Sequence, residues 1–115
     1  MTGQYTTGKT TLTPNVLLTI ARMAAVEVEG VNGMAPIRAG VPNLRAHGKD
    51  GVNIVMEDDN VFVNMYLTLD GDVNIRDVSR NVQHAVARAI EEMTGLVVGQ
   101  VNIHIEDVIF ENGES

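Results

Sequence analysis

Residues 52–69 decide the fold of this chain, and they read VNIVMEDDNVFVNMYLTL. Apolar and polar residues alternate with period two on both sides of Asp58-Asp59-Asn60, which is the pattern of two β-strands joined by a tight turn. Side chains alternate between the two faces of a sheet, so only one face of this hairpin is apolar. The core face is predicted to hold Val52, Ile54, Met56, Val61, Val63, Met65 and Leu67, and the outer face Asn53, Phe62, Asn64, Tyr66 and Thr68.

Two predicted helices flank the hairpin in the sequence. The first begins at Thr13-Pro14, because threonine caps free amides and proline is tolerated in a first turn, and it should run to about Glu29, with Gly30 ending it. The second is capped by Asn74 and stopped by Thr94-Gly95. Its apolar stripe consists of Ile75, Val78, Val82, Ala85, Val86, Ala89 and Met93.

A third alternating run, residues 97–107, predicts a closing strand. Its inward side chains are Val101, Ile103 and Ile105, and its outward ones are Asn102, His104 and Glu106. Between the first helix and the hairpin, residues 30–51 are rich in Gly and Pro, and either lack regular structure or hold a short element around residues 35–44.

These elements predict an α+β fold in which two helices pack on one face of a small three- to four-stranded mixed sheet. The length of 115 residues allows one domain over the whole chain, with residues 1–9 and 111–115 as flexible ends.

The first helix is more apolar than one small domain can bury. Polar residues occupy a narrow stripe, and the apolar arc around the rest is broken only by Glu27. We therefore expect part of this helix to face another subunit.

Composition narrows the classes of function. The net charge of −7 disfavours binding to nucleic acid or to an anionic membrane over the whole surface, and aromatic residues at 3% provide few rings for stacking bases. The absence of cysteine excludes disulfides and thiolate chemistry. The longest apolar run, residues 16–28, is too short to span a bilayer, so no direct membrane insertion is predicted.

Two short motifs allow a specific function and a plainer interpretation. Residues 3–10 match G-x-x-x-x-G-K-[ST] but have no strand before them and no helix at the lysine, so we interpret them as a polar N-terminal segment. Residues Gly30–Gly33 resemble the G-x-x-G loop of KH domains, although the plainer interpretation is a helix stop and turn.

Two surfaces hold the candidate interaction residues. On the outer sheet face aromatic and amide side chains gather, a combination common at protein interfaces: Phe62, Asn64, Tyr66, Asn102 and His104. On the exposed side of the second helix basic residues recur every four positions: Arg76, Arg80, His84 and Arg88. This basic stripe is either a docking site for an acidic partner or a solvated face with weak intrahelical ion pairs.

We predict no catalytic, cofactor-binding or metal-binding residues. A nucleophile needs a base and an orienting group, and the three histidines lie in no known ligand spacing.

Several blocks of the sequence resemble the alkaline shock protein family, the Gls-type proteins of the envelope stress response in Gram-positive bacteria. They are residues 12–17 (LTPNVL), 24–31 (AAVEVEGV), 74–78 (NIRDV), 81–83 (NVQ), 93–96 (MTGL) and 101–108 (VNIHIEDV). The resemblance implies a cytoplasmic protein without catalytic residues that assembles with copies of itself. It also implies a peripheral position at the membrane through a separate, membrane-anchored partner protein, as in some members.

The predicted function is a non-enzymatic oligomerising scaffold or regulatory adaptor in envelope homeostasis. The alternative is a KH-like RNA-binding module that uses the Gly30–Gly33 loop together with Arg38, Arg45 and Lys49.

Overall fold

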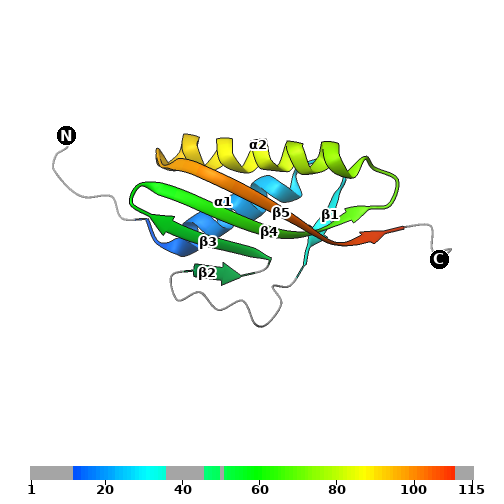
Figure 1. Ribbon diagram of the computed structural model, residues 1–115, viewed down its shortest axis with the longest axis horizontal. Coiled ribbons are helices and arrows are strands. Elements are labelled where there is room, and N and C mark those ends of the chain that lie inside the picture. Colours follow the sequence, from blue (N-terminus) through cyan, green and yellow to red (C-terminus); the bar gives the residue numbers. More distant parts are fainter. Residues whose placement is uncertain (1–11, 36–45, 50, 111–115) are drawn as a thin grey trace.

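The computed structural model describes residues 12–35, 46–49 and 51–110 (Figure 1). The elements follow one another as α1 Pro14–Val26, β1 Val31–Met34, β2 Ala46–Lys49, β3 Val52–Glu57, β4 Asn60–Asp70, α2 Ile75–Thr94 and β5 Val97–Ile109. Three predictions concern residues outside the described ranges. They are the flexible ends at 1–9 and 111–115, the polar segment at residues 3–10, and most of the short element at 35–44.

The sheet is built around β4. One edge of β4 pairs in parallel with β5 along its whole length. The other edge is shared, because β3 pairs antiparallel with residues 60–65 and β1 pairs antiparallel with residues 67–69. The described chain therefore contains a five-stranded mixed sheet that is no more than four strands wide, since β1 and β3 occupy the same side of β4.

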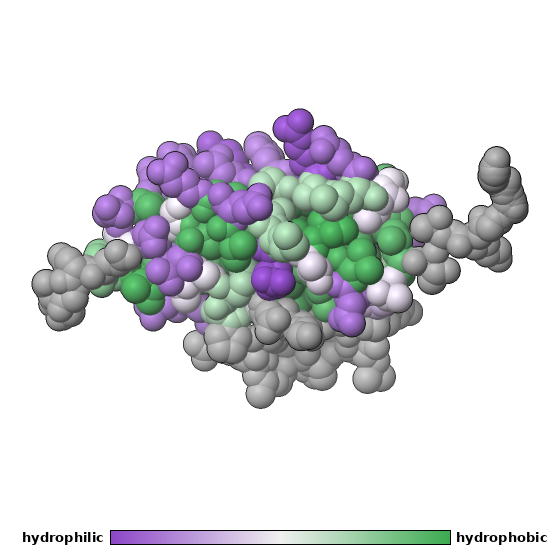
Figure 2. Space-filling model, turned by 180° about the vertical axis from the view of Figure 1, so that it is seen from behind, coloured by the Kyte–Doolittle hydropathy of each residue, from purple (hydrophilic) through white to green (hydrophobic). Residues whose placement is uncertain are grey.

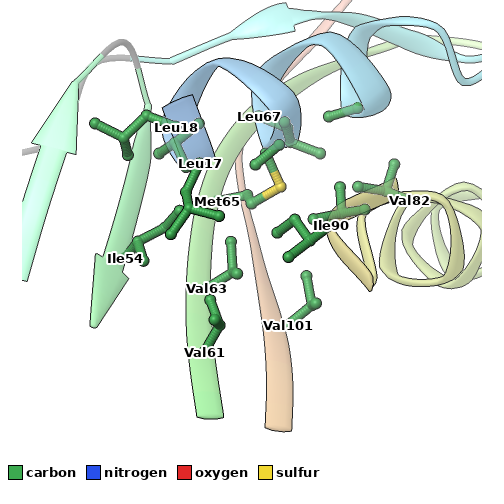
Figure 3. Packing of buried hydrophobic residues seen from close by; sticks show 14 of the residues in the cluster. Leu17, Leu18, Ile54, Val61, Val63, Met65, Leu67, Val82, Ile90 and Val101 are labelled. Atoms are coloured by element: carbon green, nitrogen blue, oxygen red, sulfur yellow. The ribbon is translucent and has the colours of Figure 1, made fainter. Parts of the chain in front are cut away.

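Both helices cover one face of this sheet, and the opposite face is open (Figure 1). Every second residue of β4 is fully buried beneath the helices: Val61, Val63, Met65, Leu67 and Leu69. The helices contribute Leu17, Leu18, Ala21 and Ala25 from α1 and Val78, Val82, Val86 and Ile90 from α2. Figure 3 shows side chains of both helices and of β4, among them Leu17, Met65 and Ile90, converging between the helices and the central strand. The predicted α+β class, with two helices on one face of a mixed sheet, is confirmed.

Two predictions about the first helix and the segment after it were wrong. The helix ends at Val26, not Glu29, and Gly30 follows in a left-handed conformation with φ of 100°. Residues 31–34 then form β1, because β3 is too short to pair with the second half of β4 and leaves that edge available. The Gly30–Gly33 segment is thus a turn followed by a strand, and it lacks the loop between two helices that clamps RNA backbone in KH domains.

Three residues predicted for the core lie at the ends of their elements and are exposed. Met56 is 36% exposed next to the hairpin turn, and Ile75 and Met93, at the two ends of α2, are 46% and 71% exposed. Terminal positions have fewer neighbours than central ones. Ile90 takes the buried place at the C-terminal end of α2.

Candidate interaction surfaces

The open sheet face carries a row of three asparagines across adjacent strands. Asn53 of β3 is paired with Asn64 of β4, which is paired with Asn102 of β5. The Asn102 Nδ2 donates a hydrogen bond to Asn64 Oδ1 over 3.2 Å. Asn53 is buried, and its Oδ1 accepts no hydrogen bond from the residues that the structure describes. A buried amide oxygen without a donor is costly, so this row is not optimised for stability alone.

Aromatic side chains lie on both sides of the asparagine row. The rings of Tyr66 and His104 stack, with centroids 4.7 Å apart and planes 13° apart, and His104 Nε2 lies 3.5 Å from Asn64 Oδ1. The Phe62 ring lies over Gly99, where a Cβ atom would come within 2.7 Å of Phe62 Cε1. The structure therefore brings all five predicted residues of this face together, although it assigns them no role.

The basic stripe of α2 points away from the sheet. Arg76, Arg80, His84 and Arg88 lie on its outer side. The Arg88 Nε donates to Glu92 Oε2 over 2.9 Å, and this hydrogen bond and charge raise the pKa of Arg88. The stripe and the open sheet face lie on different sides of the molecule, so they do not form one site.

Helix α1 has an exposed apolar side in addition to its buried one. Val16, Met23 and Val26 are 41%, 51% and 41% exposed, and Thr19 between them is also exposed. In Figure 1 the sheet lies in front of α1, and Figure 2, seen from behind, shows green apolar residues reaching the surface. We call Val16, Thr19, Met23 and Val26 the α1 seam.

Two polar residues of α2 were not singled out by the sequence analysis. Gln83 Nε2 donates to the carbonyl oxygen of Val101 over 3.1 Å, and Glu91 Oε2 accepts from the amide of Val98 over 3.0 Å. Both tie α2 to the outer edge of β5. Nothing in the local sequence pattern marks them, because the contact depends on how α2 crosses the sheet.

A metal centre would require several ligating side chains close together within residues 12–35, 46–49 and 51–110. These residues contain no group of three or more His, Asp or Glu side chains that could hold a metal ion. Among them, no helix is sufficiently long and apolar to cross a membrane.

Comparison with solved structures supports the fold. One variant of MamM CTD superimposes with a TM-score of 0.51 over 81% of this chain and 93% of its own, at 13% sequence identity. A nickel form of another MamM CTD variant gives a TM-score of 0.50 at 13% identity, again over 81% of this chain. Likeness at this identity concerns the fold alone.

Comparison of sequences identifies the family. The Bacillus subtilis (strain 168) protein YqhY is 33% identical over 108 residues, covering 90% of this chain and 79% of YqhY. The Streptococcus pyogenes serotype M6 protein Spy1535 is 31% identical over 112 residues, covering 96% of this chain and 86% of Spy1535. The model of the alkaline shock protein 23 family, described as having a cell envelope-related function, matches residues 2–110. The predicted resemblance is thereby confirmed, and the chain belongs to the alkaline shock protein 23 family.

Proposed function

We propose that this protein is a non-enzymatic scaffold or adaptor of the cell envelope, which acts by binding copies of itself and a membrane-anchored partner protein. The envelope-related function of the alkaline shock protein 23 family supports a role at the cell envelope. The self-association rests on one observation, the exposed apolar seam of α1.

The spacing of the α1 seam suits a second helix. Its members stand three, four and three residues apart, which is the a/d spacing of a coiled-coil seam. Each apolar side chain that leaves water on burial contributes about 1.5–3 kcal/mol when burial is complete. Three half-exposed side chains from each of two subunits thus provide a substantial part of the free energy of a helix–helix contact.

The charges beside the α1 seam favour α1 of a second copy as the partner. With Val16 and Met23 as a positions, Arg22 is a g position and Glu27 the following e position. In a parallel pair, g of one helix lies beside the following e of the other, so Arg22 lies beside Glu27 of the partner subunit. An antiparallel pair would instead bring like charges together.

The test compares the same substitution at two exposed methionines. Met23→Glu places a charge in the seam, whereas Met93→Glu places it at the end of α2, where the side chain is 71% exposed. Light scattering over a wide concentration range should give a mass above the 12.4 kDa of one chain for the unaltered protein and for Met93→Glu. It should give a lower mass for Met23→Glu than for either of these, because the charge disrupts the α1 contact.

A strict monomer for the unaltered protein at every concentration would refute self-association. Equal masses for the two glutamate variants would place the contact elsewhere. For the partner protein, the measurement is co-purification from the native host with the unaltered chain as bait. The expected result is recovery of a protein that has a membrane-spanning segment and that stays bound to the bait during a wash at high salt.

A further inference from the structure

The outer edge of β5 is unpaired within the described chain. Strand β5 runs over Val97–Ile109, and its only ladder there is the parallel one with β4. An unpaired strand edge presents a row of amide and carbonyl groups to which another strand can add, and proteins commonly block such edges. Here the edge is blocked in part only.

Polar side chains cap this edge at both ends. Near its start, the amide of Val98 donates to Glu91 and the carbonyl of Val101 accepts from Gln83. Near its end, the amide of Val108 donates to the carboxylate of Asp107 over 2.8 Å. The pairing of β5 with β4 is also irregular near both ends of this stretch. Gly99 and Glu106 are the extra residues of two bulges.

Between the caps, the described part of the chain leaves the backbone groups of two residues available. Successive residues of a strand direct their backbone groups to opposite edges. Because the Val101 carbonyl points away from β4 to reach Gln83, Ile103 and Ile105 point the same way, while Asn102 and His104 face β4. Among the residues that the structure describes, no side chain caps Ile103 or Ile105.

We infer that this window is a second self-contact, in which β5 of two copies pairs antiparallel about a twofold axis at His104. The inference rests on the proposed self-association for the choice of a second copy as the partner. In this register, Ile103 lies opposite Ile105 of the partner subunit, and each such pair exchanges both backbone hydrogen bonds. The caps on either side limit the pairing to this register.

The side chains around the axis are compatible with the pairing. His104 lies opposite His104 of the partner subunit, so the stacked pair of Tyr66 and His104 continues into its symmetry mate across the new ladder. Ile103 and Ile105, half-buried on the helix face, extend the core layer toward the partner. The first part of β5, residues 97–105, contains no Asp, Glu, Lys or Arg. In this register, Glu106 and Asp107 lie opposite this uncharged part of β5 of the partner subunit. They therefore do not face the same two acidic residues of the partner.

Disulfide trapping tests the register directly, because the chain contains no cysteine. Residue 104 and its symmetry mate form a non-hydrogen-bonded pair, whose Cα atoms lie about 4.5 Å apart. That distance lies within the range that a disulfide spans. His104→Cys should thus form a covalent dimer within minutes under mild oxidant at micromolar protein. Asn102→Cys, on the same strand face, should form at least about tenfold less, since its opposite residue is 106 and not 102.

A second experiment introduces opposite charges at residue 104 and distinguishes the β5 contact from the α1 contact. The disulfide experiment and the charge experiment are also carried out in the Met23→Glu variant, which is designed to lose the α1 contact. There, His104→Lys and His104→Glu should each abolish the remaining dimer, and an equimolar mixture of the two should restore it. Equal trapping at residues 102 and 104, or no recovery in the mixture, would overturn the β5 contact. Neither result would affect the mass change caused by Met23→Glu alone, on which the proposed function depends.

Discussion

At the scale of single residues, left-handed backbone at glycine fixes where the elements turn. Gly51, with φ of 81°, precedes β3, and Gly95, with φ of 77°, ends α2. Their surroundings differ. A Cβ atom at Gly51 would collide with the carbonyl oxygen of Ala35 and lie 2.9 Å from that of Tyr66, whereas nothing lies within 4 Å at Gly95.

Alanine substitution at these two glycines is expected to distinguish the cost of a left-handed backbone from the cost of a steric clash. Gly95→Ala should cost about 1 kcal/mol of unfolding free energy, the usual penalty for a left-handed non-glycine residue. Gly51→Ala should cost at least about 3 kcal/mol, because backbone atoms must also move. Urea unfolding measures both, and equal losses would contradict the close packing of Ala35 and Tyr66 around Gly51.

The start of α2 depends on a single side chain. Asn74 Oδ1 accepts from the amide of Asp77 over 3.0 Å, which is an N-cap interaction. Asn74→Ala should lower the unfolding free energy by about 1 kcal/mol. Asn81→Ala, at an exposed position within the same helix, is the control and should be neutral or slightly stabilising. A loss of equal size at Asn81 would mean that the cap contributes nothing.

At the scale of elements, the two sides of α1 have different surroundings. Leu17, Ala21 and Ala25 are completely buried against the sheet and α2, while the α1 seam faces outward. The buried side fixes the position of the helix in the fold. The seam is therefore free to change without loss of the core.

Exchange of the two charges beside the α1 seam tests the parallel arrangement. Arg22→Glu and Glu27→Arg should each weaken self-association severalfold, because each places like charges across the helix pair. The double variant should recover most of the affinity, measured by sedimentation equilibrium. Additive losses in the double variant would exclude the pairing of residue 22 with residue 27 of the partner subunit. Far-ultraviolet circular dichroism should be the same for all three variants.

At the scale of the whole molecule, the net charge of −7 opposes assembly. Copies of an acidic chain repel one another, and salt screens this repulsion. Raising the salt from about 20 mM to about 200 mM, which shortens the screening length severalfold, should strengthen self-association of the unaltered protein. Sedimentation velocity at both salt concentrations measures it. Weaker association at high salt would indicate that local ion pairs dominate the contact.

The same comparison separates the scaffold from the RNA-binding alternative. Binding to nucleic acid releases counterions and weakens as salt rises, which is the opposite trend.

The local sequence pattern determined the elements that depend on near neighbours. The alternation of residues 52–69 specified the hairpin and the sides of β4, because the two-residue period alone decides which side chains share a face. Asn74 and Gly95 likewise marked the ends of α2. The excess of apolar residues on α1 indicated that one side would stay exposed, as Met23 does.

Only the tertiary structure decided the features that join distant segments. The strands β1 and β2 fall in a Gly- and Pro-rich segment and form because the edges of β4 and β3 are available to them. The capping of Val98 and Val101 at the outer edge of β5 depends on Gln83 and Glu91, which reach this strand from α2. Periodicity records which face a residue takes, but pairing along an edge depends on contacts between segments far apart in the chain, and no local pattern contains them.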